Sequence, residues 1–300
     1  MTPTRGRPRI AITTGDPSGT GPEISVAAAR DPRVTACCEP VIYGRTDAAF
    51  LDQFPRGVVN AGAGRHAYDL IVAATNDALA GRVDAIATAP VSKAAFAAAG
   101  IPWPGHTDLL AHLCGVREQA MMFWSDTLRV VLATVHIPLA QVPAAITVDS
   151  LAATVALTAR SLPRFGIAHP RIAVAGLNPH AGEDGLLGTE DRDVIAPAVA
   201  RARDQGFDVA GPFPADTLFG RAVRGEFDCV VAMYHDQGLV PVKLVAFGKS
   251  VNVTIGLPII RTSVDHGTAF DIARMGKADA GSMVEAVLLA AKLAGTTASV

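Results

Sequence analysis

Short apolar runs alternate along this 300-residue chain with longer segments of helical periodicity, and this alternation constrains the fold more than any other feature. Apolar runs that end at turn or polar residues predict buried strands. They lie at Arg9 to Thr14, Pro40 to Tyr43, Asp84 to Ala89, Leu128 to Val135, Arg171 to Leu177 and Asp228 to Met233. The predicted helices are Tyr68 to Leu79, Ser150 to Arg164, Arg192 to Asp204 and Ser282 to Leu293.

Strands that alternate with helices predict an α/β fold, in which mainly parallel sheets are covered by helices on both faces. Right-handed crossovers bring the carboxyl ends of successive strands to one edge of such a sheet, and functional residues are expected there. A chain of this length is long for a single core, so we expect two lobes. The turn-like residues Cys114, Gly115 and Val116 suggest a lobe boundary near residue 118.

Charge and composition exclude several classes of partner. Half of the residues are hydrophobic and only 18% are charged, so the whole chain is expected to fold. Lys and Arg together number 26 against 28 Asp and Glu, and no basic run occurs. Binding to nucleic acid or to an anionic membrane is therefore not expected.

The cysteines and the apolar segments indicate a soluble, cytoplasmic protein. The four cysteines have no CxxC spacing, which is typical of reduced cytosolic thiols and excludes a zinc ribbon. The apolar run near the N-terminus covers only Ile10 to Ile12, too short for a secretion signal. The longest uncharged stretch, Val130 to Val148, is interrupted by polar residues and prolines, and we interpret it as part of a soluble fold.

Three of the strand-like runs are followed by a histidine. LRVVLATVH ends at His136, RIAVAGLNPH at His180 and FDCVVAMYH at His235. If these strands are parallel neighbours, three imidazoles converge at one sheet edge, where they suit Zn²⁺, Mn²⁺, Co²⁺ or Ni²⁺ and leave coordination positions open for substrate. The alternative is three separate histidines, each hydrogen-bonded to its own loop.

Glycine-rich turns supply weaker signals. The segment from Gly15 to Glu23 joins a strand to a helix with Pro22 in its first turn, and its backbone amides could meet an anion, although it lacks the dinucleotide fingerprint. Gly105, His106 and Thr107 suggest a helix start with Thr107 as the cap, which leaves His106 without a structural role. Gly267 to Asp271 suggests a second glycine turn into a helix. Each turn has a purely structural alternative.

Side chains that can donate hydrogen bonds to an anion are concentrated between Lys243 and His266. Few acidic residues accompany these donors, so a phosphate or carboxylate ligand fits them, although solvated side chains on a loop are the alternative. The set comprises Lys243, Asn252, Thr254, Arg261, Thr262, Ser263 and His266. Nucleophilic hydrolysis is disfavoured, because no G-x-S-x-G motif occurs and Cys229 lies inside an apolar run.

Read together, these motifs resemble the 4-hydroxythreonine-4-phosphate dehydrogenase family of pyridoxal phosphate biosynthesis, within the isocitrate and isopropylmalate dehydrogenase-like superfamily. The resemblance covers most of the chain. It is carried by TTGDPSGTGPEI, APVSKAAFAAAGIPWPGHTDLLA, LATVHIPL, GLNPHAGEDGLLGTED, GPFPADTLF, AMYHDQG and VNVTIGLPIIRTSVDHGTAFDIA. The chain is compact between Gly44 and His66, and its opening loop differs from other members, which leaves substrate preference open.

The resemblance implies a homodimer of two-lobed subunits, with the active site in the cleft between the lobes and the metal site completed by the partner subunit. One α/β/α lobe would contain residues 1–118 plus 250–300, and the other, residues 119–249, would carry the metal ligands and the dimer contacts. The implied metal ligands are His136, His180 and His235. The implied substrate-binding residues are His106, Thr107, Lys243, Asn252 and Arg261.

The same resemblance implies NAD or NADP as cofactor, held near His266 and Gly267, and one divalent ion, Zn, Mg, Mn or Co. The expected reaction oxidises 4-phosphohydroxy-L-threonine to 2-amino-3-oxo-4-phosphooxybutanoate. This product loses CO₂ to give 3-amino-2-oxopropyl phosphate, a step in pyridoxine 5'-phosphate biosynthesis. No general base is assigned, and the candidates are His106, Lys243 and Asp216.

Four other functions stay open. A sister activity oxidises D-threonate or D-erythronate 4-phosphate, and a related branch oxidises aromatic cis-dihydrodiols, against which His106, Thr107 and Arg261 argue. A three-histidine site also fits a metal-dependent hydrolase that needs no nicotinamide. The last alternative is a non-catalytic ligand-binding protein.

Overall fold

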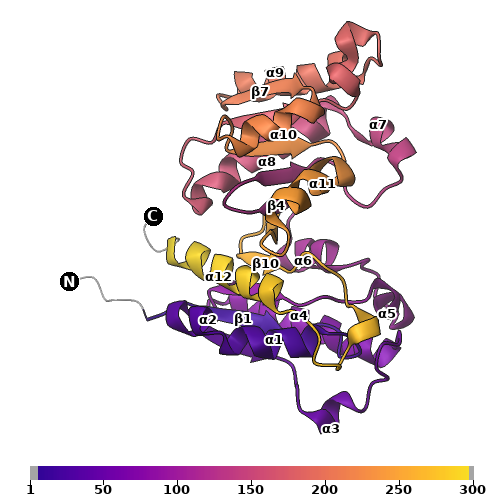
Figure 1. Cartoon of the computed structure of the whole chain (residues 1–300), viewed down its shortest axis with the longest axis vertical. Helices are drawn as coiled ribbons and strands as arrows, with labels where there is room; N and C mark the ends of the chain where they lie inside the picture. The colour runs from indigo at the N-terminus through magenta and orange to yellow at the C-terminus, as the bar shows by residue number, and fades with distance from the viewer. Residues whose placement is uncertain (1–5, 297–300) are drawn as a thin grey trace, which may run out of the picture. The chain divides into compact units, whose positions relative to one another are not determined.

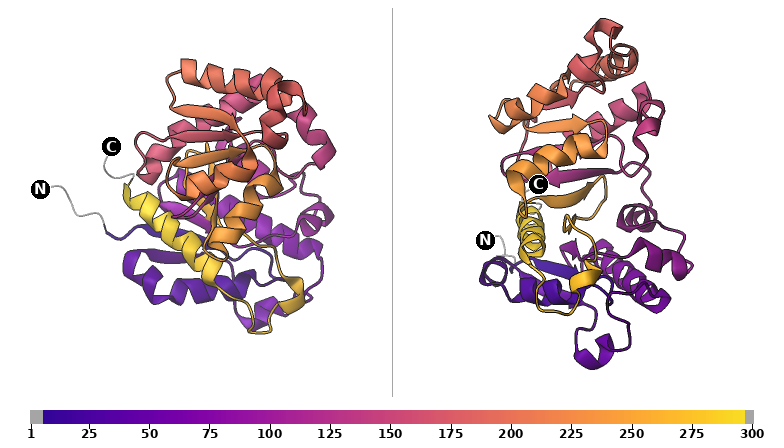
Figure 2. Two further views of the ribbon diagram at one scale, coloured as in Figure 1. Left: turned by 45° about the horizontal axis from the view of Figure 1, so that its top comes forward. Right: turned by 45° about the vertical axis from the view of Figure 1, so that its right-hand side comes forward.

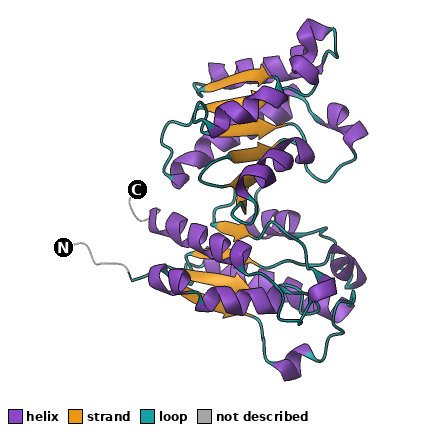
Figure 3. Ribbon diagram, viewed as in Figure 1, coloured by secondary structure: helices purple, strands orange, loops and turns teal. Residues whose placement is uncertain are grey.

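A computed structural model describes residues 6–296 of the chain. The chain divides into two compact units, one formed by residues 1–117 with 251–300 and the other by residues 118–250. Each unit contains a sheet with helices packed against it (Figure 3). The predicted α/β fold class with mainly parallel sheets is confirmed.

The first unit has the strand order β2-β1-β3-β10-β9. Its strands are β1 (Arg9–Thr13), β2 (Glu39–Tyr43), β3 (Ala85–Thr88), β9 (Val251–Ile255) and β10 (Arg261–Ser263). Its helices are α1 (Gly21–Arg30), α2 (Pro32–Cys37), α3 (Ala48–Leu51), α4 (Ala61–Leu79), α5 (Lys93–Ala98), α6 (His106–Cys114) and α12 (Gly281–Thr296). Strands β1, β2, β3 and β10 are parallel, and β9 is antiparallel to β10.

Helices α1, α2 and α12 lie on one face of this sheet, and α4 covers the other together with α5 and α6 (Figures 1 and 2). Ile71 of α4, Ile86 of β3, Phe96 of α5 and Leu109 of α6 are all buried in one apolar core. Pro22 occupies the first turn of α1, as predicted, because that turn needs no donor from it. This packing fixes the strand ends that carry the polar residues described below.

The second unit has the strand order β4-β5-β8-β6-β7. Its strands are β4 (Ala120–Trp124), β5 (Arg129–Leu132), β6 (Ile172–Ala175), β7 (Val209–Phe213) and β8 (Cys229–Ala232). Its α-helices are α7 (Val142–Ala145), α8 (Val148–Ser161), α9 (Ala196–Asp204), α10 (Ala215–Val223) and α11 (His235–Ala246). Shorter helical turns are η1 (Leu139–Gln141), η2 (Leu162–Phe165), η3 (Pro179–Gly185) and η4 (Asp191–Ile195).

Strands β5, β8, β6 and β7 are parallel, and β4 is antiparallel to β5. Leu218 of α10 and Leu239 and Val242 of α11 bury their side chains against Val130 and Val230 of the sheet. Helices α8 and α9 pack against each other, and α9 contacts β7. Three of the parallel strands, β5, β6 and β8, precede His136, His180 and His235 in the sequence.

All six predicted strands and all four predicted helices are present; β2 ends at Tyr43 as predicted, and the other five strands end one to three residues earlier than expected. Strands β4, β7, β9 and β10 were not predicted. Strand β7 contains Gly211 and Pro212, and β10 has only three residues with Arg261 among them, so neither resembles an apolar run. Tertiary pairing, and not a local apolar run, produces β7 and β10.

Within residues 6–296 no single helix is long and apolar enough to cross a bilayer. One pair of segments, Leu139–Ala145 with Val148–Phe165, passes the same test of length and composition, but it is bent by 90° at its break.

Candidate functional site

A row of polar residues follows the carboxyl edge of the sheet in the first unit. Thr13 of β1 pairs with Thr88 of β3, Thr88 pairs with Ser263 of β10, and Ser263 pairs with Asn252 of β9. The Thr88 hydroxyl donates to Ser263 Oγ at 3.0 Å, and Ser263 Oγ donates to the Thr88 carbonyl at 3.1 Å. The sheet register therefore brings Asn252 to the edge that the α/β topology predicts for function.

Arg261 is a buried cation at this edge, with only 2% of its surface exposed. Its guanidinium donates to Thr254 Oγ1 at 3.0 Å and to Thr88 Oγ1 at 2.7 Å. Within the described residues it forms no ion pair, and its Nε has no hydrogen-bond partner. Burial lowers the pKa of Arg261 to about 9, so the side chain is still cationic at neutral pH. A buried, unpaired guanidinium favours an anionic ligand.

His106 is the first residue of α6, and its Nε2 is buried with no hydrogen-bond partner in the part of the chain that the structure describes. Burial, with a smaller contribution from the charge of Arg261, holds the pKa of His106 well below its ordinary value. The imidazole is therefore neutral at pH 7 and lies near Arg261. Asn252 Oδ1 is likewise buried and unpartnered within residues 6–296.

The prediction that Thr107 caps this helix is wrong. Gly105 is the N-cap of α6, and Thr107 lies inside the first turn. Gly105 has an extended φ of 175° and supplies no side-chain cap, and the helix begins at His106, two residues earlier than a Thr107 cap would place it. The Thr107 hydroxyl is consequently not committed to a capping role.

The glycine loop from Gly15 to Thr20 is buried and packed against its own chain. The Gly19 amide donates to the Asp16 carbonyl, and the Thr20 amide donates to the Thr268 carbonyl, both at 3.0 Å. These two amides are therefore not open to an anion. Asp16 Oδ1 accepts from the Ser18 amide at 2.8 Å, and burial raises the pKa of the Asp16 carboxyl.

His266 and Gly267 are exposed, and His266 Nδ1 lies 2.9 Å from the Gly267 carbonyl. The predicted helix after this turn is not formed, since only the short 3₁₀ turn η5 (Phe270–Ile272) follows. Ala269 has a φ of +44°, a left-handed conformation that breaks a helix. The first unit thus holds His106, Thr107, Asn252, Arg261, His266 and Gly267.

In the second unit, β5, β8 and β6 are neighbouring parallel strands, which confirms the topology expected for the three histidines. The rings of His136 and His235 have centroids 5.6 Å apart. His235 Nδ1 lies 2.7 Å from Asp236 Oδ1, which leaves Nε2 for another partner. A carboxylate on the second ring nitrogen is the usual environment of a metal-binding histidine.

His180 does not join this pair within one chain. No group of three or more His, Cys, Asp or Glu at metal-binding spacing occurs among the described residues of one chain, so the three-histidine site stays a prediction. His180 is exposed and lies in η3, a turn whose residues 180–184 all have positive φ. This left-handed turn, and not a continued strand, sets the direction of the His180 side chain.

Lys243 and Asp216, two further candidates, are exposed on helices of the second unit. Lys243 lies on α11, which begins at His235, and Asp216 lies in the first turn of α10.

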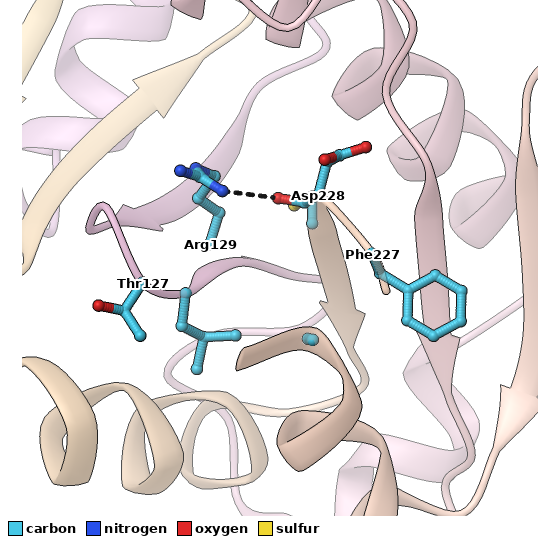
Figure 4. Close-up of a pocket in the computed structure, with 7 residues that line it drawn as sticks. Thr127, Arg129, Phe227 and Asp228 are labelled. Carbon is cyan, nitrogen blue, oxygen red and sulfur yellow. Dashed lines mark hydrogen bonds between the residues drawn. The ribbon is translucent and has the colours of Figure 1, made fainter. Parts of the chain in front are cut away.

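A shallow hollow in the second unit lies at the opposite edge of the sheet, where β5 and β8 begin (Figure 4). Thr127, Arg129, Phe227 and Asp228 line it, and the Arg129 guanidinium donates to the Asp228 carbonyl at 3.5 Å. None of the candidate residues lines this hollow, and it therefore contributes nothing to the candidate site.

A protein-family comparison matches residues 23–290 to the pyridoxal phosphate biosynthetic protein PdxA. The match covers most of the chain, including every candidate residue at the strand edges described above. The chain belongs to the PdxA family.

Members of the PdxA family resemble the chain over nearly its whole length. A 4-hydroxythreonine-4-phosphate dehydrogenase of Desulforapulum autotrophicum is 44% identical, with 98% of each chain covered. One of Burkholderia vietnamiensis is 47% identical, over 95% of this chain and 96% of the relative. A protein of Bradyrhizobium diazoefficiens, provisionally named a D-threonate 4-phosphate dehydrogenase, is 44% identical over 97% of this chain and 98% of its own.

Solved structures give the same result for the fold. The 4-hydroxythreonine-4-phosphate dehydrogenase of Klebsiella pneumoniae has a TM-score of 0.87 and 40% identity, with 97% of this chain and 99% of that chain covered. A terephthalate 1,2-cis-dihydrodiol dehydrogenase of Burkholderia xenovorans has a TM-score of 0.66 and 34% identity, with 96% and 98% covered. The fold expected from the PdxA resemblance is therefore confirmed.

Two residues at the histidine edge of this PdxA chain were missed by sequence reasoning. Asp191 is buried and accepts from the amides of Leu177 and Asn178 at 2.8 and 3.0 Å, which holds the turn that leads to His180. Gln237 links the ends of β6 and β8. The available signals were an aspartate in GTEDRD and a glutamine two residues after His235, but neither indicates a contact by itself.

Proposed function

We propose that this protein is an NAD-linked dehydrogenase that oxidises 4-phosphohydroxy-L-threonine to 2-amino-3-oxo-4-phosphooxybutanoate. The product is a β-keto acid that loses CO₂ to give 3-amino-2-oxopropyl phosphate, in pyridoxine 5'-phosphate biosynthesis. The observation that carries the proposal is the buried, unpaired Arg261 beside the neutral His106. It occurs in a chain that aligns almost completely with relatives of that name.

Arg261 is proposed to bind an anionic group of the substrate. Two of its nitrogens are held by Thr88 and Thr254, which fixes the plane of the guanidinium, and Nε has no partner among residues 6–296. An anchored guanidinium loses little side-chain entropy when it binds a phosphate or carboxylate. Thr107, Asn252 and Lys243 complete the proposed substrate-binding set.

Of the three candidates for the general base, His106 is favoured. Its neutral imidazole has an unpartnered Nε2 within the described part of the chain, so it can accept a hydrogen bond from a substrate hydroxyl at neutral pH. Asp216 and Lys243 are both exposed, so neither has the buried environment of His106 Nε2.

The His136 and His235 pair fits a divalent metal ion. Two imidazole nitrogens on one tetrahedral Zn²⁺ lie about 3.3 Å apart, which ring centroids 5.6 Å apart allow. The carboxylate of Asp236 beside His235 Nδ1 supports the same interpretation. We propose that Zn²⁺, Mg²⁺, Mn²⁺ or Co²⁺ binds this pair together with His180, with one of the three donated by the partner subunit.

The nicotinamide cofactor, NAD or NADP, is proposed to bind near His266 and Gly267. Both residues are exposed, and this supports contact with a ligand. When bound, NAD⁺ supplies a hydride acceptor and the divalent ion supplies positive charge for a developing alkoxide. The chain itself contributes anion binding by Arg261 and a hydrogen-bond acceptor at His106 Nε2.

A homodimer and a cytoplasmic location are part of the proposal. Exposed apolar residues of the second unit support a subunit interface there: Val240 is 65% exposed, Leu244 83%, Phe247 81% and Leu186 81%. The free thiols of Cys37, Cys38, Cys114 and Cys229 support a reducing compartment.

The activity is tested by NADH absorbance with purified protein, NAD⁺ and each divalent ion. Three substrates are compared: 4-phosphohydroxy-L-threonine, D-threonate 4-phosphate and D-erythronate 4-phosphate. We expect the highest kcat/KM for the amino acid phosphate. Preference for a sugar-acid phosphate would instead favour the second candidate, which the relative from Bradyrhizobium diazoefficiens supports. Absence of NADH with all three would contradict both dehydrogenases and leave a hydrolase or a binding protein.

The metal assignment predicts that His180→Ala loses bound metal and activity but still folds, because His180 is exposed in a surface turn. Metal content is measured by atomic emission, with circular dichroism as the check on folding. The exposed His169, in the loop before β6, provides the matched control variant His169→Ala. Unchanged metal content in His180→Ala would exclude His180 from the site.

A further inference from the structure

One side chain connects two of the strand ends that lead to the proposed metal ligands. Gln237 Nε2 donates to the carbonyl of Gly176 at 2.7 Å, and Gln237 Oε1 accepts from the amide of Met233 at 2.7 Å. Gly176 directly follows β6, and Met233 directly follows β8. A single amide group therefore spans the two neighbouring strand ends.

The connection extends to the third strand. The amide of Thr134 donates to the Met233 carbonyl at 3.2 Å, and Thr134 Oγ1 donates to the same carbonyl at 2.7 Å. Thr134 follows β5 and precedes His136 by two residues. Hydrogen bonds thus run from the end of β5 through Met233 and Gln237 to Gly176 at the end of β6.

Each of the three histidines lies shortly after one of these bonded residues. His136 comes two residues after Thr134, His235 two residues after Met233, and His180 four residues after Gly176. Because these spacers are short, the position of each strand end limits where the histidine that follows it can lie. Asp191 adds to this limit, since its carboxylate holds the turn between Gly176 and His180.

Close packing on both sides fixes the position of Gln237. The next residue, Gly238, lies so near the sheet that an added Cβ would be 2.7 Å from Leu132 Cδ2 and 2.9 Å from Val130 Cγ1. At Gly176 an added Cβ would be 2.7 Å from Asp191 Oδ1. Both backbone segments are in close contact with their neighbours, which limits how far the ends of the gap bridged by the glutamine amide can shift.

The gap requires one donor and one acceptor, which only an amide of this length supplies. A glutamate would direct a carboxylate oxygen at the Gly176 carbonyl, and these two acceptors repel. An apolar side chain would leave both the Met233 amide and the Gly176 carbonyl without their present partner.

We infer that Gln237 is a positioning residue for the proposed metal ligands: its amide fixes the end of β8, two residues before His235, against the end of β6, four residues before His180, so it places each of these histidines for the metal ion that it binds. This inference rests on the proposed metal-dependent function. Groups that orient metal ligands in this way change metal affinity by about 10- to 100-fold when they are lost.

The test titrates the metal-free, full-length protein with Co²⁺ and follows the visible absorption of the bound ion, whose intensity and wavelength report coordination geometry. We expect Gln237→Glu to weaken Co²⁺ binding by about tenfold or more and to shift the spectrum. In a turnover assay kcat should fall while KM for NAD⁺ is unchanged. Gln205→Glu, the same change at an exposed residue after α9, is the matched control and should behave as wild type.

Urea unfolding of every variant separates loss of positioning from loss of fold. If Gln237→Glu does not fold, Gln237→Met serves instead, because it has a similar volume and removes both hydrogen bonds without adding charge. A wild-type Co²⁺ affinity and spectrum in the folded variant would overturn the inference and leave the metal site intact. No Co²⁺ absorption in the wild-type protein would instead contradict the metal site, and with it the inference.

Discussion

Arg261 and His106 form the most unusual environment in the first unit, because a buried cation lies near a buried neutral imidazole. Burial of a charge is costly unless a partner compensates it, and the two threonine hydroxyls on Arg261 are only weak compensation. A substrate anion would supply the missing charge. The energetic cost of burying Arg261 is therefore consistent with a binding role.

Arg261→Lys tests this role without removing the positive charge. A lysine offers one ammonium group, which cannot bond both threonines and a substrate anion in the same plane. Loss of a charged hydrogen bond costs about 1.5–3 kcal/mol, so KM for the phosphorylated substrate should rise about 10- to 100-fold. KM for NAD⁺ should change little. Equal increases in both KM values, or none, would contradict the assignment, and Arg30→Lys on the exposed end of α1 is the control.

His106 also predicts a pH dependence of stability. Its pKa in the folded protein is lowered well below 6.5, mainly by burial, whereas the unfolded chain has the ordinary value. Above pH 6.5 the residue is neutral in both states and contributes nothing. As the pH falls below 6.5, the unfolded chain takes up a proton that the folded chain does not, so stability decreases.

The variant His106→Gln should remove this part of the pH dependence. Urea unfolding midpoints are measured between pH 5 and pH 7.5, where the other histidines titrate equally in both proteins. The free energy of unfolding should fall less on acidification in the variant, because its unfolding takes up as much as one proton fewer than that of the wild type. Identical pH profiles for the two proteins would show that His106 is protonated normally in the folded state.

At the scale of the elements, Glu23 of α1 holds a distant loop against the first unit. Its carboxylate accepts from the amides of Arg274 and Gly276 at 2.9 and 3.0 Å. The Arg274 guanidinium in turn donates to the carbonyls of Leu51 and Phe54. Three segments far apart in sequence therefore meet here, and one of them continues from the turn at His266 proposed to bind the cofactor.

Glu23→Gln should loosen this loop, because an amide can accept from only one of the two backbone donors while its NH₂ group faces the other. Hydrogen exchange measured by mass spectrometry should be faster in the peptide that contains Arg274 and Gly276. Global stability should fall by about 1 kcal/mol, the typical worth of one hydrogen bond. Unchanged exchange there would show that Arg274 alone holds the loop. Glu118→Gln, at an exposed carboxylate, is the control.

At the scale of the whole molecule, the exposed apolar residues of α11 support the proposed homodimer. Leu244 and Phe247 are more than 80% exposed on a segment that starts at His235. Side chains of this size are costly in water when they lie in a group, and such groups are typical of subunit interfaces. An interface here would place a partner near the proposed metal ligands, in agreement with the incomplete histidine set of one chain.

Leu244→Glu should therefore weaken the dimer and the metal site together. Light scattering after size-exclusion chromatography is expected to report a monomer for the variant and a dimer for the wild type, with lower metal content in the monomer. Val58→Glu, at an exposed apolar residue of the first unit, is the control. A Leu244→Glu variant that is still dimeric and fully metallated would exclude α11 from the interface.

Several features could be derived from the sequence because they depend on local pattern. Runs of buried apolar residues are sufficient to predict β1, β3, β5, β6 and β8, and the alternation with helices is sufficient for a parallel sheet. The order of strands and histidines along the chain then brings the segments that contain His136, His180 and His235 to one edge. The motifs also indicate the family, since they are continuous in sequence.

Other features required the tertiary structure, because they depend on contacts between distant residues. Strand β10 is polar and short, and it forms only because β3 and β9 supply its hydrogen bonds. The burial of Arg261 and the lowered pKa of His106 come from neighbours that no local pattern identifies. The left-handed turn at His180 and the bridge formed by Gln237 are likewise set by packing. The sequence by itself determined the fold class and the residues that come near the edges, whereas the tertiary structure decided which side chains are buried, unpaired or held in place, since only the packed chain fixes burial and hydrogen-bond partners.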